Sequence, residues 1–326
     1  MPSVGSNATI GIVDENVWGS GTPTVTVRIP FTSENIVKDK GIRASNAMTG
    51  KRQRSLWIEG KNTVGGDINS EIQPTNFGKL FKHALGLVDT YGPSGTSNYY
   101  VHNKYPSGTL PAGLRIEIDR VGGVFTYNGM KVNQMTLNCS VGDPLTGTFS
   151  LLGKDETVGA VGTGTVIAFP EVNPFTFDEG ALYLDGSASA ADVSSVSLTV
   201  NNNLLADKGR LGSKFRVAIP EGGFMDITGT INMEFDNVTT YNKFVNATET
   251  ALQLKFVTDD VFGAGSTPYE LWVTIPRIVF TGTTPTVGGP ELIYHDLPFI
   301  GFKDPTGGFY EKDAIRMKYI TSDATI

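Results

Sequence analysis

A chain of 326 residues is long enough for two domains of about 150 residues each. Its 39 glycines and 17 prolines are typical of short strands joined by turns and argue against a helical protein. A formal charge of −7 argues against a protein that coats DNA, and a single cysteine, Cys139, excludes an internal disulfide framework. No apolar run approaches the roughly 18 residues of a membrane-spanning helix, and we expect no secretion signal.

Residues 1–23 are rich in Gly, Ser, Asn and Thr, and Trp18 is their one large aromatic side chain. We interpret them as an N-terminal arm that either is frayed or needs a neighbouring molecule to bury Trp18. A strand is predicted next, from Thr24 to Thr32.

The stretch from Glu34 to Ser45 has an echo from Asn202 to Ser213. The residues that the two share are Asn35, Asp39, Lys40, Gly41 and Ser45 in the first and Asn203, Asp207, Lys208, Gly209 and Ser213 in the second. Asp followed by Lys-Gly suits a turn in which the glycine takes a positive φ. We therefore predict that each stretch is the exit of a strand.

Two further matches follow in the same order. Ile68–Ile72 resembles Ile231–Phe235, and Leu114–Arg120 resembles Leu271–Arg277. The residue offset falls from 168 to 163 to 157, as expected if one unit was copied and its copy lost loop residues. The sequence therefore predicts a duplicated unit.

A polar segment from Ala44 to Arg54 ends in three basic residues, Lys51, Arg52 and Arg54. It is either a contact loop for an acidic partner surface or a solvated loop. Strands are predicted at Ser55–Glu59 and Asp67–Ile72, before the clearest helix of the chain. The apolar residues of that helix fall on one face, at Phe77, Leu80, Phe81, Ala84 and Leu85.

Residues 89–112 are rich in Gly, Ser, Pro and Tyr and predict a loop. Leu114–Ile118 then alternates apolar and charged residues, which predicts a half-buried strand. The alternation slips by one residue between Val132 and Met135, which predicts a β-bulge. The returning strand is Leu145–Leu152.

Residues 154–192 are dominated by Gly, Ala, Thr and Ser, and we interpret them as a connector with an extra hairpin at Phe175–Leu184. The predicted organisation is an arm at 1–23, a first unit at 24–153, the connector, and a second unit at 193–326. The second unit contains a weaker helix, capped by Asn237, with Val238, Tyr241, Phe244 and Val245 on one face.

The sequence contains no recognisable catalytic or metal-binding motif. The three histidines, His83, His102 and His295, are scattered, and packing or solvent exposure explains each better than ligation. Neither a nucleophile elbow nor a P-loop is present. We therefore predict a structural protein with no enzymatic activity, no cofactor and no metal.

Several features together resemble the major tail tube protein of long-tailed bacteriophages. They are Trp18-Gly19, the Asp-Lys-Gly strand end, Gly66-Asp67-Ile68 before an amphipathic helix, the long alternating strands, and the hairpin at Leu145–Phe149. The resemblance implies a mainly β fold with minor helix: two tandem β-sandwich or partial-barrel units, each with one flanking α-helix.

The resemblance also implies an assembly. Six units form a ring, so two units per chain imply a homotrimeric, pseudo-hexameric ring, with a homohexamer as the alternative. Stacked rings form the conduit through which viral DNA leaves, without specific binding and without a membrane. The tape measure protein and the tail terminator are the other expected partners, in a virion tail assembled in the host cytoplasm.

Six residues are candidates for specific positions in this assembly. Glu117 and Asp119 are candidate lumen-facing acids, or else surface or inter-subunit salt-bridge positions. Trp18, Lys51, Arg52 and Arg54 are candidate ring-stacking contacts. A lumen carrying part of the negative charge of three chains would repel phosphate and let DNA slide.

Two other classes of function stay open on the sequence alone. A two-domain β-sandwich that binds carbohydrate, such as a virion adhesin, would show clustered exposed aromatic residues and would not polymerise. A glycan-cleaving virion enzyme is disfavoured because no catalytic site stands out, and a carboxylate pair chosen from 33 acids would carry little information.

Overall fold

The structure is a computed structural model, and it is mainly β with minor helix, as predicted. It describes residues 4–94, 99–169, 172–188, 192–236, 238–262, 267–282, 284–306 and 313–326. In these residues nineteen strands are connected through hydrogen-bonded pairings, and β5 and β6 form a separate hairpin.

The elements of the first half are η1 (Gly5–Asn7), β1 (Thr9–Glu15), β2 (Val27–Ile29), β3 (Ser33–Glu34), β4 (Val37–Asp39), β5 (Arg43–Ala44), β6 (Trp57–Ile58), β7 (Thr63–Glu71), α1 (Gly78–Leu85), β8 (Gly86–Ser94), β9 (Tyr99–Pro106), β10 (Gly113–Asp119), β11 (Val124–Ser140), β12 (Thr146–Gly153) and β13 (Asp155–Gly159). Those of the second half are η2 (Phe177–Glu179), β14 (Gly180–Leu184), β15 (Ser187–Ala188), β16 (Val193–Asn201), β17 (Asp226–Glu234), α2 (Thr239–Val245), β18 (Thr250–Val261), β19 (Pro268–Phe280), β20 (Tyr294–Phe302) and β21 (Arg316–Thr321).

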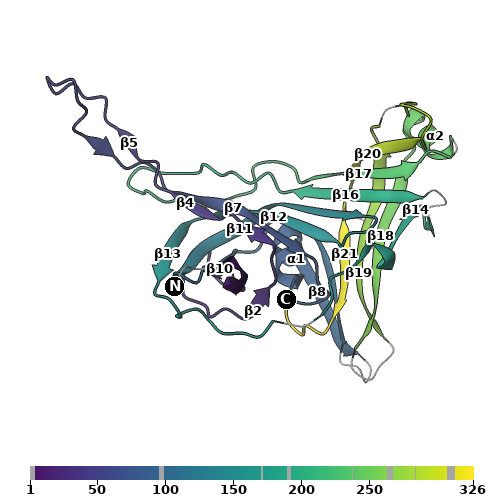
Figure 1. Cartoon of the computed structure of the whole chain (residues 1–326), viewed down its shortest axis with the longest axis horizontal. Coiled ribbons are helices and arrows are strands. Elements are labelled where there is room, and N and C mark those ends of the chain that lie inside the picture. The colour runs from purple at the N-terminus through teal and green to yellow at the C-terminus, as the bar shows by residue number, and fades with distance from the viewer. Residues whose placement is uncertain are drawn as a thin grey trace.

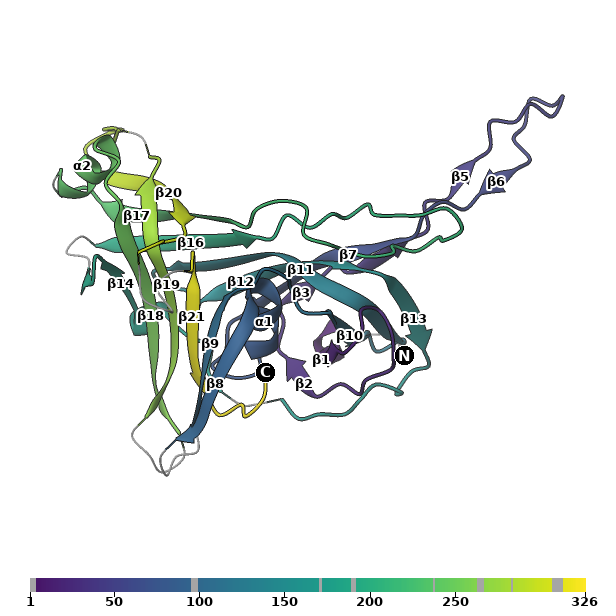
Figure 2. The same ribbon diagram turned by 180° about the vertical axis from the view of Figure 1, so that it is seen from behind.

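One long antiparallel sheet runs through both halves of the chain (Figures 1 and 2). Its strands lie in the order β3 and β4, β7, β12, β11, β16, β17, β20, β19. The two halves meet where β11 pairs with β16. One face of this sheet packs on the core and the other is polar, because apolar and polar residues alternate along its strands.

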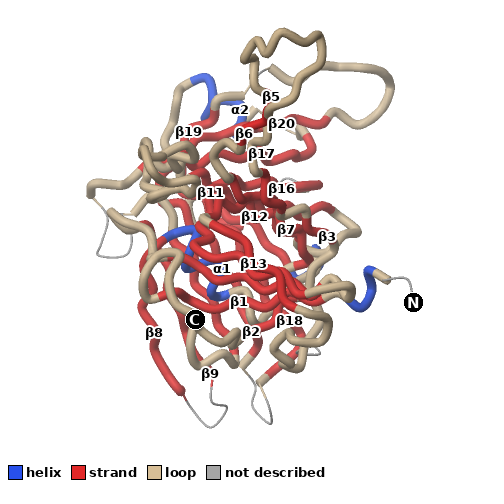
Figure 3. The backbone as a smooth tube through the Cα atoms, turned by 90° about the vertical axis from the view of Figure 1, so that its left-hand side faces the viewer, coloured by secondary structure: helices blue, strands red, loops and turns tan. Residues whose placement is uncertain are grey.

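A second layer of strands closes the core in each half. In the first half, β2, β1, β10 and β13 join the N-terminal part of β11. In the second half, β15, β14, β18 and β21 join β19, and the hairpin of β8 and β9 extends this layer through β9 and β21. In the view of Figure 3, α1 lies among the strands of the first half.

The two halves have the same pairing order. The first half pairs β2 with β1, β1 with β10, β10 with β11, β11 with β13 and β12, β12 with β7, and β7 with β3 and β4. The second half pairs β15 with β14, β14 with β18, β18 with β19, β19 with β21 and β20, β20 with β17, and β17 with β16. The strands of the two lists correspond in the order in which they are given. Each half also has one α-helix after its β7 or β17 strand.

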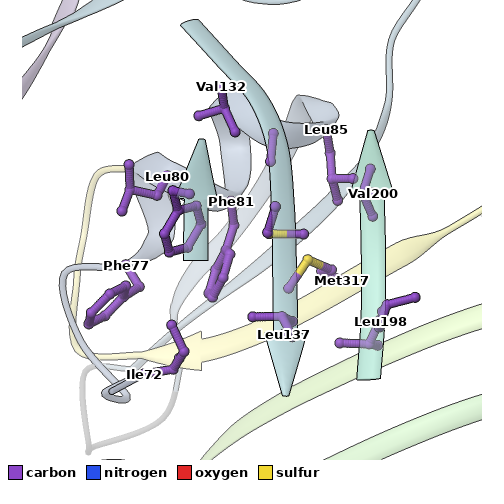
Figure 4. Packing of buried hydrophobic residues seen from close by; sticks show 14 of the residues in the cluster. Ile72, Phe77, Leu80, Phe81, Leu85, Val132, Leu137, Leu198, Val200 and Met317 are labelled. Atoms are coloured by element: carbon purple, nitrogen blue, oxygen red, sulfur yellow. The ribbon is translucent and has the colours of Figure 1, made fainter. Parts of the chain in front are cut away.

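The predicted helix at Phe77–Leu85 is confirmed as α1. It ends at Leu85 and is followed by Gly86, whose φ of 122° is a conformation that favours glycine. Figure 4 shows its side chains Phe77, Leu80, Phe81 and Leu85 beside Val132 and Leu137 of β11, Leu198 and Val200 of β16, and Met317 of β21. The predicted bulge is also confirmed, since the pairing of β11 with β12 shifts between Val132 and Gln134.

The loop predicted for residues 89–112 is wrong. Most of these residues form the hairpin of β8 and β9, because β9 pairs along β21, more than two hundred residues away in sequence. Residues 95–98 of the predicted loop lie outside the described part of the chain. The N-terminal arm predicted for residues 1–23 is also wrong, because β1 is a core strand in which Ile10 and Ile12 are fully buried.

The connector predicted at 154–192 contains elements of both halves. β13 pairs with β11, and β14 pairs with both β15 and β18. The extra hairpin was predicted at Phe175–Leu184, but the hairpin of β14 and β15 lies at Gly180–Ala188, because Phe177–Glu179 form the 3-10 turn η2. One match between the halves is wrong as well: Leu114–Asp119 of the first stretch lies in β10, whereas Leu271–Arg277 lies in β19, which has the place of β11. The cap predicted at Asn237 lies outside the described residues.

Candidate assembly surfaces

The outward side of the long sheet is a polar face that spans both halves of the chain. We define the polar face by the outward residues of β7, β12, β11 from Gln134 onward, β16, β17 and β20. Hydroxyl and amide groups contact one another across its strands. Thr136 and Thr199 bring their Oγ1 atoms to 3.0 Å at the junction of the halves, and the Thr148 hydroxyl donates to Asn69 Oδ1 at 2.7 Å. These contacts stabilise a flat polar surface without burying it.

The charge on the polar face has one sign. Its acidic residues are Asp67, Glu71, Asp226, Glu234 and Asp296. None of the strand segments that form the face contains a lysine or an arginine. Because opposite charges are missing, the negative potential of these carboxylates is not neutralised within the face.

Some of these acids are held in place by neighbouring amides. Asn35 Nδ2 lies 3.4 Å from Asp67 Oδ2, and Asn203 Nδ2 donates to Asp226 Oδ2 at 2.6 Å. Asn232 Nδ2 donates to Asp296 Oδ1 at 2.6 Å. Asn35 and Asn203, which mark the sequence repeat, therefore have the same role in the two halves. Each contacts an aspartate of the polar face.

The two acids predicted to face the lumen do not lie on the polar face. Glu117 and Asp119 belong to β10, in the other layer of the first half. Glu117 Oε1 accepts a hydrogen bond from the Thr165 amide at 2.6 Å, and Asp119 Oδ1 accepts one from the Val121 amide at 2.8 Å. Both carboxylates therefore bind loop backbone of their own chain. Sequence reasoning missed the acids of the polar face, although the lack of Lys and Arg in those strands is a signal for them.

A hairpin arm projects from the body of the molecule (Figures 1 and 2). We define the arm as residues 42–58, with β5 and β6 at its base and a hydrogen bond from the Ser45 amide to the Leu56 carbonyl oxygen, 2.9 Å long. Lys51, Arg52 and Arg54 are exposed near its tip. Its apolar side chains are also exposed, namely Ile42, Met48, Leu56, Trp57 and Ile58.

The exposed apolar side chains set the arm apart from an ordinary solvated loop. Trp57 exposes 66% of its surface and Met48 all of it. A cationic tip on an apolar stalk is suited to binding a second surface. The arm carries no acidic residue.

The two Asp-Lys-Gly stretches converge at the root of the arm, around Lys61. The carbonyl oxygen of Lys61 lies near Gly41, and its ammonium group is 3.5 Å from Asp207 Oδ1. The Asn62 amide donates to the Lys214 carbonyl oxygen at 2.7 Å, and Lys214 also pairs with Glu59. The loop between β16 and β17 therefore supports the arm of the same chain.

The prediction that both stretches are strand exits is right for one of them. Asp39 is the last residue of β4, and its Oδ1 accepts a hydrogen bond from the Gly41 amide at 2.9 Å, with Gly41 at φ 56°. By contrast, β16 ends at Asn201, so Asp207 lies well inside the following loop. Lys208 accepts a hydrogen bond from the Val217 amide there, at 3.2 Å. Local turn chemistry explains the first stretch, and loop packing explains the second.

The remaining repeat markers have local roles. The Ser45 hydroxyl accepts a hydrogen bond from the Ala47 amide at 3.2 Å, and the Ser213 hydroxyl accepts one from the Phe215 amide at 3.2 Å. The carbonyl oxygen of Lys40 accepts from the Gly60 amide at 3.2 Å. These bonds shape the two loops that meet at the arm root.

A buried arginine that the sequence did not single out joins these loops to the sheet. Arg216 is 5% exposed, and its guanidinium donates to the carbonyl oxygens of Ala206 at 2.6 Å, Gly153 at 2.7 Å and Val64. Its burial lowers its pKa from the ordinary arginine value, although the group stays charged. Arg216 therefore ties the loop of the second half to β7 and β12 of the first.

Trp18 is used within its own chain, so the predicted contact with another molecule is not supported. Its indole Nε1 donates to the Gly129 carbonyl oxygen at 2.9 Å, and the Lys154 ammonium lies 5.2 Å from the centre of the ring. The Gly19 amide donates to Glu15 Oε2 at 2.6 Å. Trp18 thus caps the end of the first half beside β1 and β11.

The histidines pack into the fold. His83 Nε2 lies 2.8 Å from Asp14 Oδ1, and burial lowers the pKa of the imidazole. His102 lies between Thr90 Oγ1 and the carbonyl oxygen of Asp323, at 2.8 Å from each. Among the described residues, no group of three or more His, Cys, Asp or Glu side chains is arranged to hold a metal ion. No helix in the described ranges is long and apolar enough to cross a membrane.

Comparison with known proteins identifies one family. The profile of the family described as phage tail tube protein matches residues 5–301, which is most of the chain. No curated protein matches the sequence significantly.

Proposed function

We propose, from the premise that the chain belongs to the phage tail tube protein family, that three copies form a closed ring in the tail of a long-tailed phage. Members of this family are structural components of the virion tail and associate with their own copies into a tube. Stacked rings of this chain form the conduit for the viral DNA. The acidic polar face, which continues from one half to the other, is the observation that carries this proposal.

The stoichiometry follows from the proposed duplication. The shared pairing order of the two halves supports two equivalent units per chain, the first from β1 to β13 and the second from β14 to β21. Six units in a ring then require three chains, and closed cyclic symmetry satisfies the sheet edges at both ends of each chain. The alternative is a ring of six whole chains.

The polar face lines the lumen in this proposal. Its carboxylates and hydroxyls give DNA phosphates no cationic partner, so no counterions are released and no stable complex forms. DNA therefore passes without specific binding. The lumen acids are Asp67, Glu71, Asp226, Glu234 and Asp296, in place of Glu117 and Asp119.

The arm makes the contact between stacked rings. Its exposed Trp57 and Met48 and its basic tip, with Lys51, Arg52 and Arg54, need a second surface, and a ring above or below offers one. The tape measure protein inside the tube and the terminator at its end are the remaining proposed partners, in a tail assembled in the host cytoplasm.

Electron microscopy of the purified protein tests the proposal. We expect tubes built of stacked rings, with three chains in each ring. A protein that stays monomeric at high concentration contradicts the tube, and six chains per ring contradict the duplication argument.

A charge reversal tests the lumen. Glu71 and Glu234 end β7 and β17, and the double variant Glu71→Lys/Glu234→Lys places six lysines in a ring of three chains. We expect tubes of this variant to retain DNA at low salt and to release it as salt rises, because lysines that neutralise phosphates release counterions. The control variant Asp259→Lys/Glu291→Lys makes the same charge change at exposed positions outside the polar face. Equal DNA retention by both variants contradicts a lumen at the polar face.

A further inference from the structure

The second layer of strands has an outer side that is distinct from the polar face. In the second half this layer runs in the order β14, β18, β19, β21, β9 and β8. Its inner side packs on the core, where Leu254, Val273 and Met317 are paired in one row and are buried. Residues that alternate with these three along their strands project to the outer side, because successive side chains of a strand point to opposite faces of its sheet.

A row of paired residues crosses the outer side. Lys255 of β18 pairs with Trp272 of β19, and Trp272 pairs with Lys318 of β21. The Lys255 ammonium group lies 4.3 Å from the centre of the Trp272 ring, and the Lys318 ammonium group lies 4.6 Å from it. The two lysines thus reach the same indole from the two neighbouring strands, and cation–π attraction stabilises them there.

A third cation lies beside this row. Arg316 precedes Lys318 by two residues on β21 and therefore projects to the same side. Its Nη2 donates to Asn103 Oδ1 at 2.6 Å, which holds the guanidinium against the sheet. We define the basic face as Lys255, Trp272, Arg316 and Lys318. Three cations gather here in a chain of formal charge −7.

Acids on the same side of the layer do not balance these cations. The side chain of Glu270 is 17% exposed, and its Oε2 lies 3.8 Å from the Lys318 ammonium group. Asp89, at the β8 end of the row, accepts a hydrogen bond from the Tyr105 hydroxyl at 2.7 Å. Within the described part of the chain, no carboxylate lies within 4.0 Å of the Lys255 ammonium group. The basic face therefore attracts anions.

The indole of Trp272 excludes one class of ligand. A neutral sugar ring binds an aromatic residue by stacking on its face, and the two lysine ammonium groups lie in the place that the sugar needs. The same contacts restrict the lysine side chains to few rotamers, so an anion binds them at a lower cost in conformational entropy. The basic face is thus suited to carboxylates and not to a neutral glycan.

Exposed apolar residues beside the basic face indicate a protein as the source of these carboxylates. In the described residues β8 is the last strand of the layer, and its Leu87 and Tyr91 project to the same side as Asp89. Leu87 is 45% exposed and Tyr91 is 51% exposed. A phosphate or sulfate polymer would gain nothing from this apolar edge, whereas protein interfaces combine cations with apolar and aromatic residues.

The spacing of these residues determines the form of the partner. One strand separates β18 from β21 and one separates β21 from β8, so their Cα atoms follow one another at about 10 Å across the layer. Residues seven apart on an α-helix lie on one side of it and about 10 Å from each other. In an extended segment, side chains on one side recur about every 7 Å and do not match. A helix that crosses the strands therefore matches the spacing.

The described residues of this chain do not supply such a helix. Neither α1 nor α2 contains an acidic residue. A second copy of the chain therefore has no described helix that complements the basic face, and the partner is a different protein.

We propose that the basic face binds an acidic helix of a protein other than this chain. Two carboxylates seven residues apart contact Lys255 and Lys318, and an apolar side chain seven residues further on lies between Leu87 and Tyr91. None of these residues belongs to the polar face or to the arm, so the contact goes beyond the proposed function. Each chain carries one basic face, so the partner binds at one copy per chain.

Peptide binding to the whole chain tests this proposal. The probe is a fluorescent synthetic helix with two glutamates seven residues apart and a leucine seven residues further on. The control peptide has the same composition, but its glutamates are five residues apart and lie on different sides of the helix. We expect fluorescence anisotropy to show that the probe binds at low salt and more weakly as salt rises, and that the control peptide binds about tenfold more weakly.

Variants of the chain locate the binding site. We expect Lys255→Gln/Lys318→Gln to weaken binding of the probe about tenfold. The control Lys208→Gln/Lys303→Gln removes two exposed lysines outside the basic face and should leave binding unchanged. The proposal is overturned if the unmodified chain does not bind the probe, if it binds both peptides equally, or if both double variants bind the probe equally.

Two further outcomes assign the basic face to another occupant and also overturn the proposal. Tighter binding of heparin than of the probe would show that the face takes a sulfated polymer. Loss of tubes in Lys255→Gln/Lys318→Gln, with the free energy of unfolding unchanged, would show that a second copy of the chain covers it. Failure of the unmodified chain to form tubes overturns the proposed function alone.

Discussion

The two helices of the chain have equivalent places in the fold and very different surroundings. Both follow the same strand of their half, and both carry an apolar stripe on one side. In α1, seven of eight residues are buried, whereas none of the seven residues of α2 is. A stripe of apolar residues therefore predicts that a helix forms, but it does not predict how deeply the helix is buried.

The difference arises from what covers each helix. The hairpin of β8 and β9 is inserted between α1 and β10, and the end of the chain also packs on α1, where Ile326 lies against Gly78. After α2 the chain continues within a few residues into β18. Around α2 the described packing is a small aromatic cluster. The centre of the Tyr241 ring lies 5.9 Å from the centre of the Phe244 ring and 6.1 Å from that of the His295 ring. The hairpin of β8 and β9 and the end of the chain therefore cover α1, whereas the packing described around α2 is limited to this cluster.

Removing one phenylalanine from each helix gives the largest expected contrast. Phe81 is fully buried among Phe77, Phe149 and Tyr319, so we expect Phe81→Ala to lower the free energy of unfolding by about 3–5 kcal/mol. Phe244 is only partly buried, so Phe244→Ala should cost about 1 kcal/mol. Urea unfolding of both variants measures the difference. Equal losses of unfolding free energy would contradict the conclusion that α1 is covered more fully than α2.

The cover of α1 also makes the first half sensitive to acid. Burial lowers the pKa of His102 to about 4, and the neutral ring accepts from the Thr90 hydroxyl and donates to the Asp323 carbonyl oxygen. A histidine with a lowered folded pKa stabilises the fold above its unfolded pKa of about 6.5, and this stability is lost as the pH falls toward 4. The loss amounts to about 3 kcal/mol at about 1.4 kcal/mol per pKa unit.

Urea unfolding between pH 7 and pH 4.5 measures this slope. His83, whose pKa burial also lowers, adds to it in the same direction, whereas Asp323, whose pKa burial raises, opposes it. The variant His102→Gln has no proton to bind there, so its slope should be smaller than that of the unmodified chain. An unchanged slope in His102→Gln would show that the acid sensitivity comes from other groups.

The same contrast explains what the sequence could and could not predict. The apolar stripe at Phe77–Leu85 and the slip in alternation near Val132 are local patterns. The first was sufficient to predict the helix, and the second was sufficient to predict the β-bulge. The strands β8 and β9 were missed because Gly92-Pro93 and the many small residues are typical of a loop, while the pairing of β9 with β21 is not visible locally. Non-local pairing decides such segments, and a sequence does not record it.

The assembly surfaces show the same limit of prediction from sequence. The tripeptide Asp-Lys-Gly is identical in both stretches, yet Asp39 ends a strand and Asp207 lies in a loop, because the contacts around Lys61 determine the second stretch. Glu117 and Asp119 have the alternation of a half-exposed strand, but alternation does not tell which of two layers a strand belongs to. The lack of Lys and Arg along the polar face is present in the sequence, but it became a usable signal only once the strands of that face were known.

The smallest expected effect concerns the open side of α2. Val245 is 57% exposed, so Val245→Ala should change the free energy of unfolding of an isolated chain by no more than about 0.5 kcal/mol. The matched change in α1, Leu85→Ala, removes a fully buried side chain and should cost about 2–5 kcal/mol. If Val245→Ala leaves the isolated chain unchanged but lowers the temperature at which tubes dissociate, a neighbouring copy supplies for α2 the cover that α1 receives from its own chain. If it destabilises the isolated chain as much as Leu85→Ala does, the two helices are equally covered and the contrast between them is wrong.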